Sequence, residues 1–163
     1  MLSHRKGSTY DLIVIAVLVL VGAIVLIVVG SVWAEFVAVA NAIPIVGGNA
    51  NASAAIIDTS SALLLFDVLF IVYLMGLGLV SIILAYFVEA HPVMFVISFI
   101  VLIISVIVSA LFTNIFIEFT TIDSLATSVA SYPLTVTAMK ALPGYIAIIG
   151  VLMLIALYKR RPA

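Results

Sequence analysis

The sequence contains no cysteine and very little charge. Without cysteine the chain can form no disulfide framework, thiolate zinc site, haem attachment or cysteine nucleophile. Lys, Arg, Asp and Glu make up 8% of the 163 residues, whereas soluble domains carry about 25%. So few charges cannot cover the surface of a soluble fold of this size. We therefore expect lipid to be the solvent for most of the chain.

The sequence also lacks the motifs of common active sites. It has no nucleophile elbow, phosphate-binding glycine loop, zinc helix motif or pair of carboxylates facing each other across a helix. The chain has only two histidines and therefore offers no plausible tetrahedral set of metal ligands. His91, which lies beside Glu89, is expected instead to cap the helix that begins at Pro92. We expect no catalytic residue, cofactor or metal, and the net charge of −1 predicts no specific nucleic-acid binding.

Long apolar runs are what the sequence has instead. Hydrophobic residues make up 67% of the chain, and a helix needs about 20 such residues to cross the hydrocarbon layer of a bilayer. Val and Ile dominate the runs, but long runs without alternation favour lipid-facing helices over barrel strands. The sequence predicts an all-α integral membrane protein with about four transmembrane helices arranged as two hairpins. The predicted spans are 12–34, 63–88, 92–117 and 142–158.

The first and fourth spans each allow a second interpretation. The charged start of the chain is similar to a signal peptide, but the run 12–34 exceeds the roughly 7–15 apolar residues of a signal-peptide core. We therefore expect a retained anchor. The run 142–158 is short for a span. Either Lys140 and Lys159 reach out to the membrane surfaces, or the helix begins earlier and kinks at Pro143.

Two polar connections, 35–62 and 118–141, separate the predicted spans. In the first, breaker residues over 44–51 predict a loop, followed by a short helix capped around 58–61. In the second, apolar residues recur at spacings of three and four over 122–129, which predicts a short amphipathic helix on the membrane surface. Neither connection is large enough to be a domain, so we expect the whole chain to form one membrane domain.

Charge placement predicts the orientation of the chain in the membrane. Four crossings put both termini on one side, and that side then holds five of the six basic residues. By the positive-inside rule, both termini are expected to be cytoplasmic. The residues that determine this topology are Arg5, Lys6, Lys159, Arg160 and Arg161.

Asp67, near the start of the second predicted span, is the one ionisable residue that could lie within the hydrocarbon layer. A carboxylate inside the membrane usually marks a proton or ion path. If the helix starts at Leu63, however, Asp67 lies one turn inside its outer end, where water and lipid headgroups solvate the side chain. We favour this interfacial interpretation and keep a buried functional carboxylate as the alternative.

Small and hydroxyl-bearing side chains form stripes in the first and third spans. Such stripes let helices pack closely in lipid, where hydroxyl groups bond across helices or to their own backbone. Packing is therefore the expected role, and the lining of a pore is the alternative. The predicted packing seam consists of Ala16, Ala23, Gly30, Ser98, Ser105, Ser109 and Thr113.

Two stretches of the chain carry a family resemblance. The first has Lys6, Gly7, Tyr10, Asp11 and Leu12 leading directly into a span, and the second contains His91, Pro92, Phe95, Ile97, Ser109, Ala110, Phe112, Asn114 and Glu118. The chain resembles small multi-pass hydrophobic proteins of viruses that have an internal lipid membrane. The resemblance implies a structural role in the virion membrane, joining lipid to capsid. The partners would be the bilayer, other membrane or capsid proteins, and further copies of the chain.

Two other functions stay open on the sequence. A pore-forming protein, such as a holin-like protein or a small channel, would use Asp67 and the serine stripe of the third span. An accessory subunit of a cellular membrane complex would need no polar site, and its partners would be other subunits. The structural role is the leading hypothesis because no residue pattern demands catalysis or transport.

Overall fold

The fold of the chain is all-α, as predicted. A computed structural model describes residues 10–87 and 92–159, and these ranges contain helices and no strand. The elements are α1 (Tyr10–Ala42), α2 (Pro44–Gly47), α3 (Ala50–Phe87), α4 (Pro92–Thr120), the 3-10 turn η1 (Asp123–Leu125), α5 (Ala126–Ser131), α6 (Pro133–Lys140) and α7 (Leu142–Lys159).

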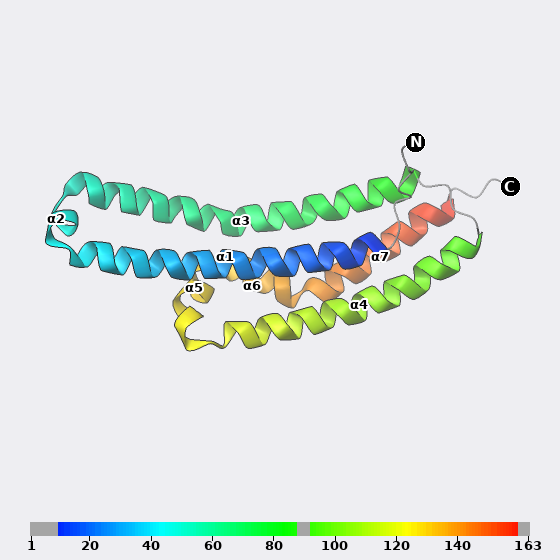
Figure 1. Cartoon of the computed structure of the whole chain (residues 1–163). Helices are drawn as coiled ribbons and strands as arrows, with labels where there is room; N and C mark the ends of the chain where they lie inside the picture. The colour runs from blue at the N-terminus through cyan, green and yellow to red at the C-terminus, as the bar shows by residue number, and fades with distance from the viewer. Residues whose placement is uncertain (1–9, 88–91, 160–163) are drawn as a thin grey trace, which may run out of the picture.

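Four long helices run side by side, and successive ones run in opposite directions (Figure 1). α1 begins and α7 ends at the same end of the bundle. The helices α1, α3 and α4 are long and apolar enough to cross a membrane, and α6 with α7 would make a fourth span that is bent by 60°. The bend lies at Ala141, between the two helices.

The helices α1 and α3 are longer than the spans predicted for them. They contain 33 and 38 residues, which at the rise of an α-helix gives about 50 and 57 Å, against about 30 Å for the hydrocarbon layer. The connection 35–62, expected to contain a loop over 44–51 and a short helix capped around 58–61, is instead helical except at a tight corner around α2. We call this segment, residues 35–62, the hairpin extension, because it extends beyond α4 and α5 (Figure 1).

The sequence explains why the hairpin extension is helical. Its breakers, Pro44, Gly47 and Gly48, are confined to the corner, and the part after the corner, 50–62, is rich in alanine and has neither glycine nor proline. Asn49 caps the start of α3, since its side-chain oxygen accepts hydrogen bonds from the backbone N–H groups of residues 51 and 52 at 3.0 and 3.3 Å.

The connection 118–141 also differs from the prediction. Ile122 has an extended backbone, and residues 123–129 form η1 and the first part of α5, not one amphipathic helix. The burial of the predicted apolar and polar faces is also partly reversed. Ser128, on the predicted polar face, is 3% exposed, whereas Ile122, on the predicted apolar face, is 46% exposed. The reason is that α5 packs against α1 and turns Ser128 inward.

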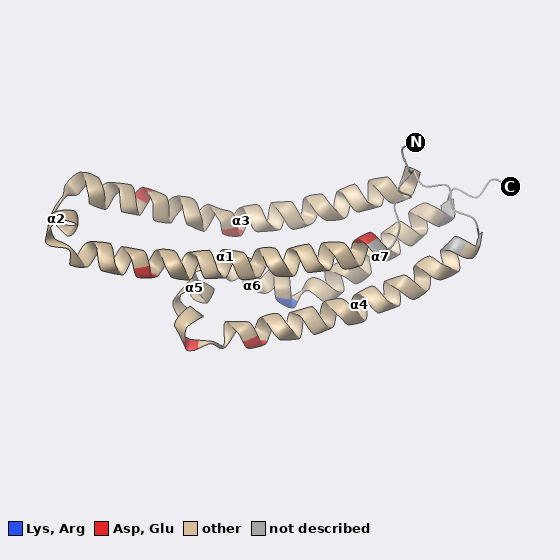
Figure 2. Cartoon of the chain, in the orientation of Figure 1, with Lys and Arg blue, Asp and Glu red and all other residues tan. Residues whose placement is uncertain are grey.

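The core lies where α1 meets the other long helices and α6. Buried side chains from five helices form one cluster, in which Ile27, Phe116 and Met139 are fully enclosed. The outer faces of the helices are apolar too, and charged positions are few along the bundle (Figure 2). Between Asp11 and Glu35, for example, α1 carries no charged residue. This distribution is compatible with an integral membrane protein.

Candidate functional site

Asp67 lies in the middle of α3 and is buried. Because α3 begins at Ala50, the carboxylate is about five turns inside the helix, and its side chain is only 5% exposed. The assumption that this helix starts at Leu63 is wrong, so a position one turn from the helix end no longer explains Asp67. Its surroundings within the bundle must do so.

The carboxylate of Asp67 accepts three hydrogen bonds from the start of α6. Thr135 donates to Oδ1 from its backbone N–H and from its hydroxyl group, each at 2.7 Å, and the backbone N–H of Leu134 donates to Oδ2 at 3.0 Å. The first N–H groups of a helix have no partner within it, and the residue that precedes α6, Tyr132, makes no side-chain capping bond. Asp67 therefore caps α6 from another helix.

The start of α6 is suited to such a cap. Pro133 occupies its first turn, where the missing N–H leaves no bond unmade and the fixed φ angle matches the helix. The remaining N–H groups, together with the positive end of the helix dipole, favour a negative charge at this point. Burial of the carboxylate is thus compensated by directed donors, which is the condition for placing such a group inside a protein.

The other end of α6 is held by α4. In a continuous helix the N–H of residue 143 would donate to the carbonyl of Met139, but Pro143 has no N–H. The hydroxyl group of Thr113 donates to this carbonyl instead, at 2.9 Å. Helical structure begins before Leu142, as the second interpretation of the fourth span predicted. The bend lies at Ala141, two residues before Pro143. Pro143 therefore provides a physical cause for the bend.

A third polar link joins α7 to α3. The hydroxyl group of Tyr145 donates a hydrogen bond to the backbone carbonyl of Leu74. Gly78 makes room for this contact, because a Cβ atom at residue 78 would overlap the Tyr145 hydroxyl group. The side chains of Asp67, Thr113 and Tyr145 therefore each connect two different helices.

Most of the predicted packing seam is buried. Ser105 and Ser109 are fully buried and donate to carbonyl groups of their own helix, those of Val101 and Val106, at 2.7 and 2.8 Å. Thr113 alone among the seam hydroxyls reaches another helix. The buried members are Ala16, Ala23, Gly30, Ser105, Ser109 and Thr113, and Ser98 is half-buried.

Comparisons with known proteins give no guide to the site. No protein-family model, curated protein or solved structure matches the chain. Within residues 10–87 and 92–159, no group of three or more His, Asp or Glu side chains is arranged to hold a metal ion. Glu89 and His91 lie outside the described residues. Of the residues predicted to determine topology, Lys159 ends α7, and the others, Arg5, Lys6, Arg160 and Arg161, lie outside the described residues as well.

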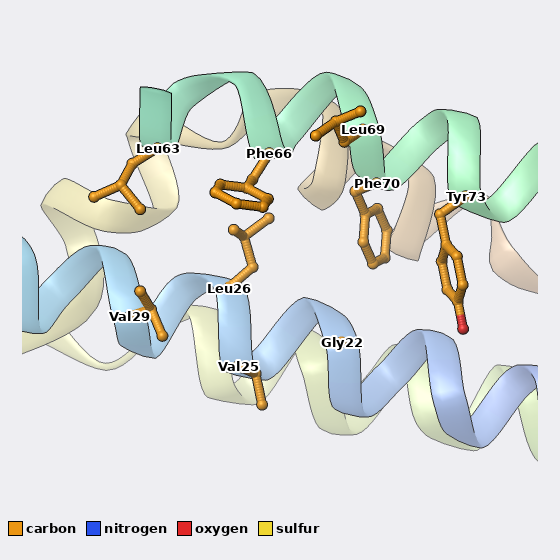
Figure 3. A pocket seen from close by; sticks show the side chains of 9 residues that line it. All are labelled: Gly22, Val25, Leu26, Val29, Leu63, Phe66, Leu69, Phe70 and Tyr73. Carbon is orange, nitrogen blue, oxygen red and sulfur yellow. The ribbon is translucent and has the colours of Figure 1, made fainter. Parts of the chain in front are cut away.

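An apolar pocket of about 380 Å³ lies between α1 and α3 (Figure 3). Aromatic side chains of α3, including Phe66 and Phe70, line one side, and Gly22, Val25 and Leu26 line the other. No residue that lines this pocket is charged. The lining is apolar apart from the hydroxyl group of Tyr73, so the pocket suits a hydrocarbon group.

Proposed function

We propose that the chain is a non-enzymatic structural protein of a membrane, and that it joins the lipid bilayer to a neighbouring protein layer. One observation carries this proposal: three side chains that link helices fix α6 and α7 in place. Asp67 and Thr113 each bond to one end of α6, and Tyr145 bonds α7 to α3. Such an arrangement makes a stable bundle and leaves these groups committed to packing.

In this proposal the chain crosses the membrane four times, as two hairpins. The first hairpin is α1 with α3, and the second is α4 with the bent pair α6 and α7. Both termini lie in the cytoplasm, as the basic residues near the chain ends indicate. The faces that point away from the core are apolar along all the long helices, which supports contact with lipid.

The hairpin extension is the part that would reach a partner protein. The helices α1 and α3 exceed the hydrocarbon thickness by about 20 and 27 Å, and residues 36–57 contain no charged side chain. Ile45 is 84% exposed and Ile57 is 64% exposed at this end of the hairpin. Exposed apolar groups of this kind mark contact surfaces. A capsid protein above the internal membrane of a virion fits this role, in line with the family resemblance.

Reporter fusions test the topology on which this proposal depends. A reporter at Ala163 and another inserted within 47–51 should lie on opposite sides of the membrane. Detection of both on the same side would show that the number of crossings between them is even, contrary to the proposal.

The absence of cysteine allows a direct test of the partner contact. An Ile45→Cys variant gives the chain one thiol at the end of the hairpin extension, to which a photoreactive cross-linker can be attached in the native membrane. We expect cross-linking to a protein of the adjacent layer, identified by mass spectrometry. The matched control is Val72→Cys, which is 58% exposed on the outer face of α3 and should cross-link to lipid. Cross-linking of both variants to lipid alone would contradict the linking role.

A pore is the second candidate, because a broken helix beside a buried carboxylate also occurs in transport proteins. If the chain conducts ions, purified protein in liposomes should show a flux that Asp67→Asn or Ser105→Leu changes. The structural proposal predicts no conductance for the unmodified chain. Co-purification with cellular subunits and not with virus particles would instead indicate an accessory subunit of a membrane complex.

A further inference from the structure

A second pocket, of about 300 Å³, lies where α5 packs beside α1 and α3. It differs from the pocket of Figure 3 because hydroxyl groups form part of its wall. We call it the hydroxyl pocket. Its hydroxyl-bearing residues are Ser60, Thr127, Ser128, Ser131 and Tyr132.

Two of these five hydroxyl groups are already used within the protein. Ser60 accepts a hydrogen bond from the indole N–H of Trp33 at 3.0 Å and donates to the carbonyl of Ile56 at 2.8 Å. Ser131 donates to the backbone carbonyl of Thr127 at 3.0 Å. The bond between Trp33 and Ser60 fixes the position of the Trp33 ring, and Trp33 lines the pocket.

The other three hydroxyl groups, those of Thr127, Ser128 and Tyr132, make no hydrogen bond to any residue that the structure describes. Ser128 is 3% exposed and Tyr132 is 2% exposed. Among the described residues, every side-chain nitrogen or oxygen that is completely enclosed has a partner. The hydroxyl oxygens of Ser128 and Tyr132 are therefore not enclosed, and the space that they reach is the pocket.

The wall of the hydroxyl pocket is partly polar and carries no charge. None of the described residues that line it is acidic or basic. Gly30 contributes backbone without a side chain, and the ring of Tyr132 lies across it, so close that a Cβ atom at residue 30 would be 2.4 Å from Cε2. A charged ligand would lose its hydration without gaining an opposite charge. A neutral ligand with hydroxyl groups would find both donors and acceptors, next to an aromatic surface.

We propose that the hydroxyl pocket binds a neutral sugar, through hydrogen bonds to Thr127, Ser128 and Tyr132 and contact with the ring of Trp33. The same sugar chemistry occurs in the headgroup of a glycolipid and in a free sugar. Trp33 also lines an apolar pocket with Val32 and Phe36, so an apolar surface for a lipid chain lies close to the sugar site. The proposal rests on the packing of α5 and does not depend on a link to a capsid.

Trp33 provides the signal for a test, because it is the only tryptophan in the chain. The purified protein is placed in phosphatidylcholine nanodiscs, and its emission is recorded as galactosyl diacylglycerol replaces part of the lipid. In parallel, free galactose is added to nanodiscs without glycolipid, and phosphatidylglycerol serves as the charged comparison. We expect a saturable change in emission with the galactose-containing probe.

Variants show whether the hydroxyl groups carry the binding. Tyr132→Phe keeps the ring and removes one hydroxyl group, and Ser128→Ala removes another. Each should weaken the binding by roughly 2- to 10-fold, as expected for one hydrogen bond. Ser124→Ala is the matched control, because Ser124 is exposed in η1 and does not line the pocket. Circular dichroism establishes that each variant has kept its helix content.

A response to galactosyl diacylglycerol alone supports the proposal with a lipid as the source of the sugar. A response to free galactose supports it with a soluble source. The proposal is overturned if neither probe changes the emission, if Tyr132→Phe and Ser128→Ala both bind as tightly as Ser124→Ala, or if phosphatidylglycerol gives an equal response.

Discussion

Replacement of Asp67 by alanine should destabilise the bundle more than any other single change in its polar links. The substitution leaves two N–H groups of α6 and the hydroxyl group of Thr135 without their acceptor. A buried donor without a partner costs about 1–3 kcal/mol, and the losses are not additive because the three donors share one carboxylate. The Thr135 hydroxyl group can also rotate to another acceptor. We therefore expect a loss of about 3–5 kcal/mol in the free energy of unfolding.

Asp67→Asn should have a smaller effect. The amide oxygen can still accept from Thr135, but the amide NH₂ group replaces the oxygen that faces the N–H of Leu134. One hydrogen bond is lost, and the charge that complements the start of α6 is lost with it. We expect a loss of about 1–3 kcal/mol. The matched control is Asp58→Ala on the same helix, an exposed site at which little change is expected.

Unfolding of these variants can be measured by circular dichroism in bicelles with increasing SDS. We expect Asp58→Ala to be the most stable of the three variants, Asp67→Asn to be less stable, and Asp67→Ala to be the least stable. A double-mutant cycle with Thr135→Val should give a coupling energy of about 1.5–3 kcal/mol, because the hydroxyl group bonds to a charged acceptor. If Asp67→Ala were as stable as Asp58→Ala, the capping role of Asp67 would be refuted.

Two further predictions concern the packing around α6 and use the same unfolding measurement. Gly30→Ala should lower stability by about 1–3 kcal/mol, because its methyl group would lie 2.4 Å from the buried ring of Tyr132. Gly76→Ala, whose added methyl group meets no atom within 4 Å, should instead raise stability by about 0.5–1 kcal/mol. A gain in stability for Gly30→Ala as well would contradict the packing at Gly30. Thr113→Val should cost about 0.6 kcal/mol, the average measured for hydrogen bonds between membrane helices, and at most about 1.7 kcal/mol. No loss would mean that Thr113 does not hold the end of α6.

The sequence was sufficient to predict the helical class and the position of α4. Pro92 is the first residue of α4 in the structure, as its place after a short polar turn predicts. The apolar runs are long and uninterrupted, so their composition alone indicates helices. The ends of α1 and α3 were harder to predict, because polarity fixes where a membrane span stops but not where a helix stops. The Ala-rich stretch 50–62 continues α3 well past the polar boundary.

The site depends on contacts between residues far apart in the chain. Asp67 and Thr135 are 68 residues apart, and no local pattern connects a carboxylate in one helix to the start of another. A signal was nevertheless present. Pro133 and Pro143 enclose a segment just long enough for a short helix, whose first N–H groups and last carbonyl groups must find partners elsewhere. Asp67 and Thr113 are polar groups in apolar runs that could provide them.

The two contacts that hold α6 also impose an order on the biogenesis of the protein. Asp67 and Thr113 are synthesised before α6, so the growing chain places an acceptor and a donor in α3 and α4 before their partners exist. An intermediate with α1, α3 and α4 therefore carries a carboxylate without its three donors, which is costly wherever that carboxylate is shielded from water. A chain that ends before residue 133 would retain that defect permanently. Completion of a stable bundle thus depends on α6, which supplies the three donors that this carboxylate needs.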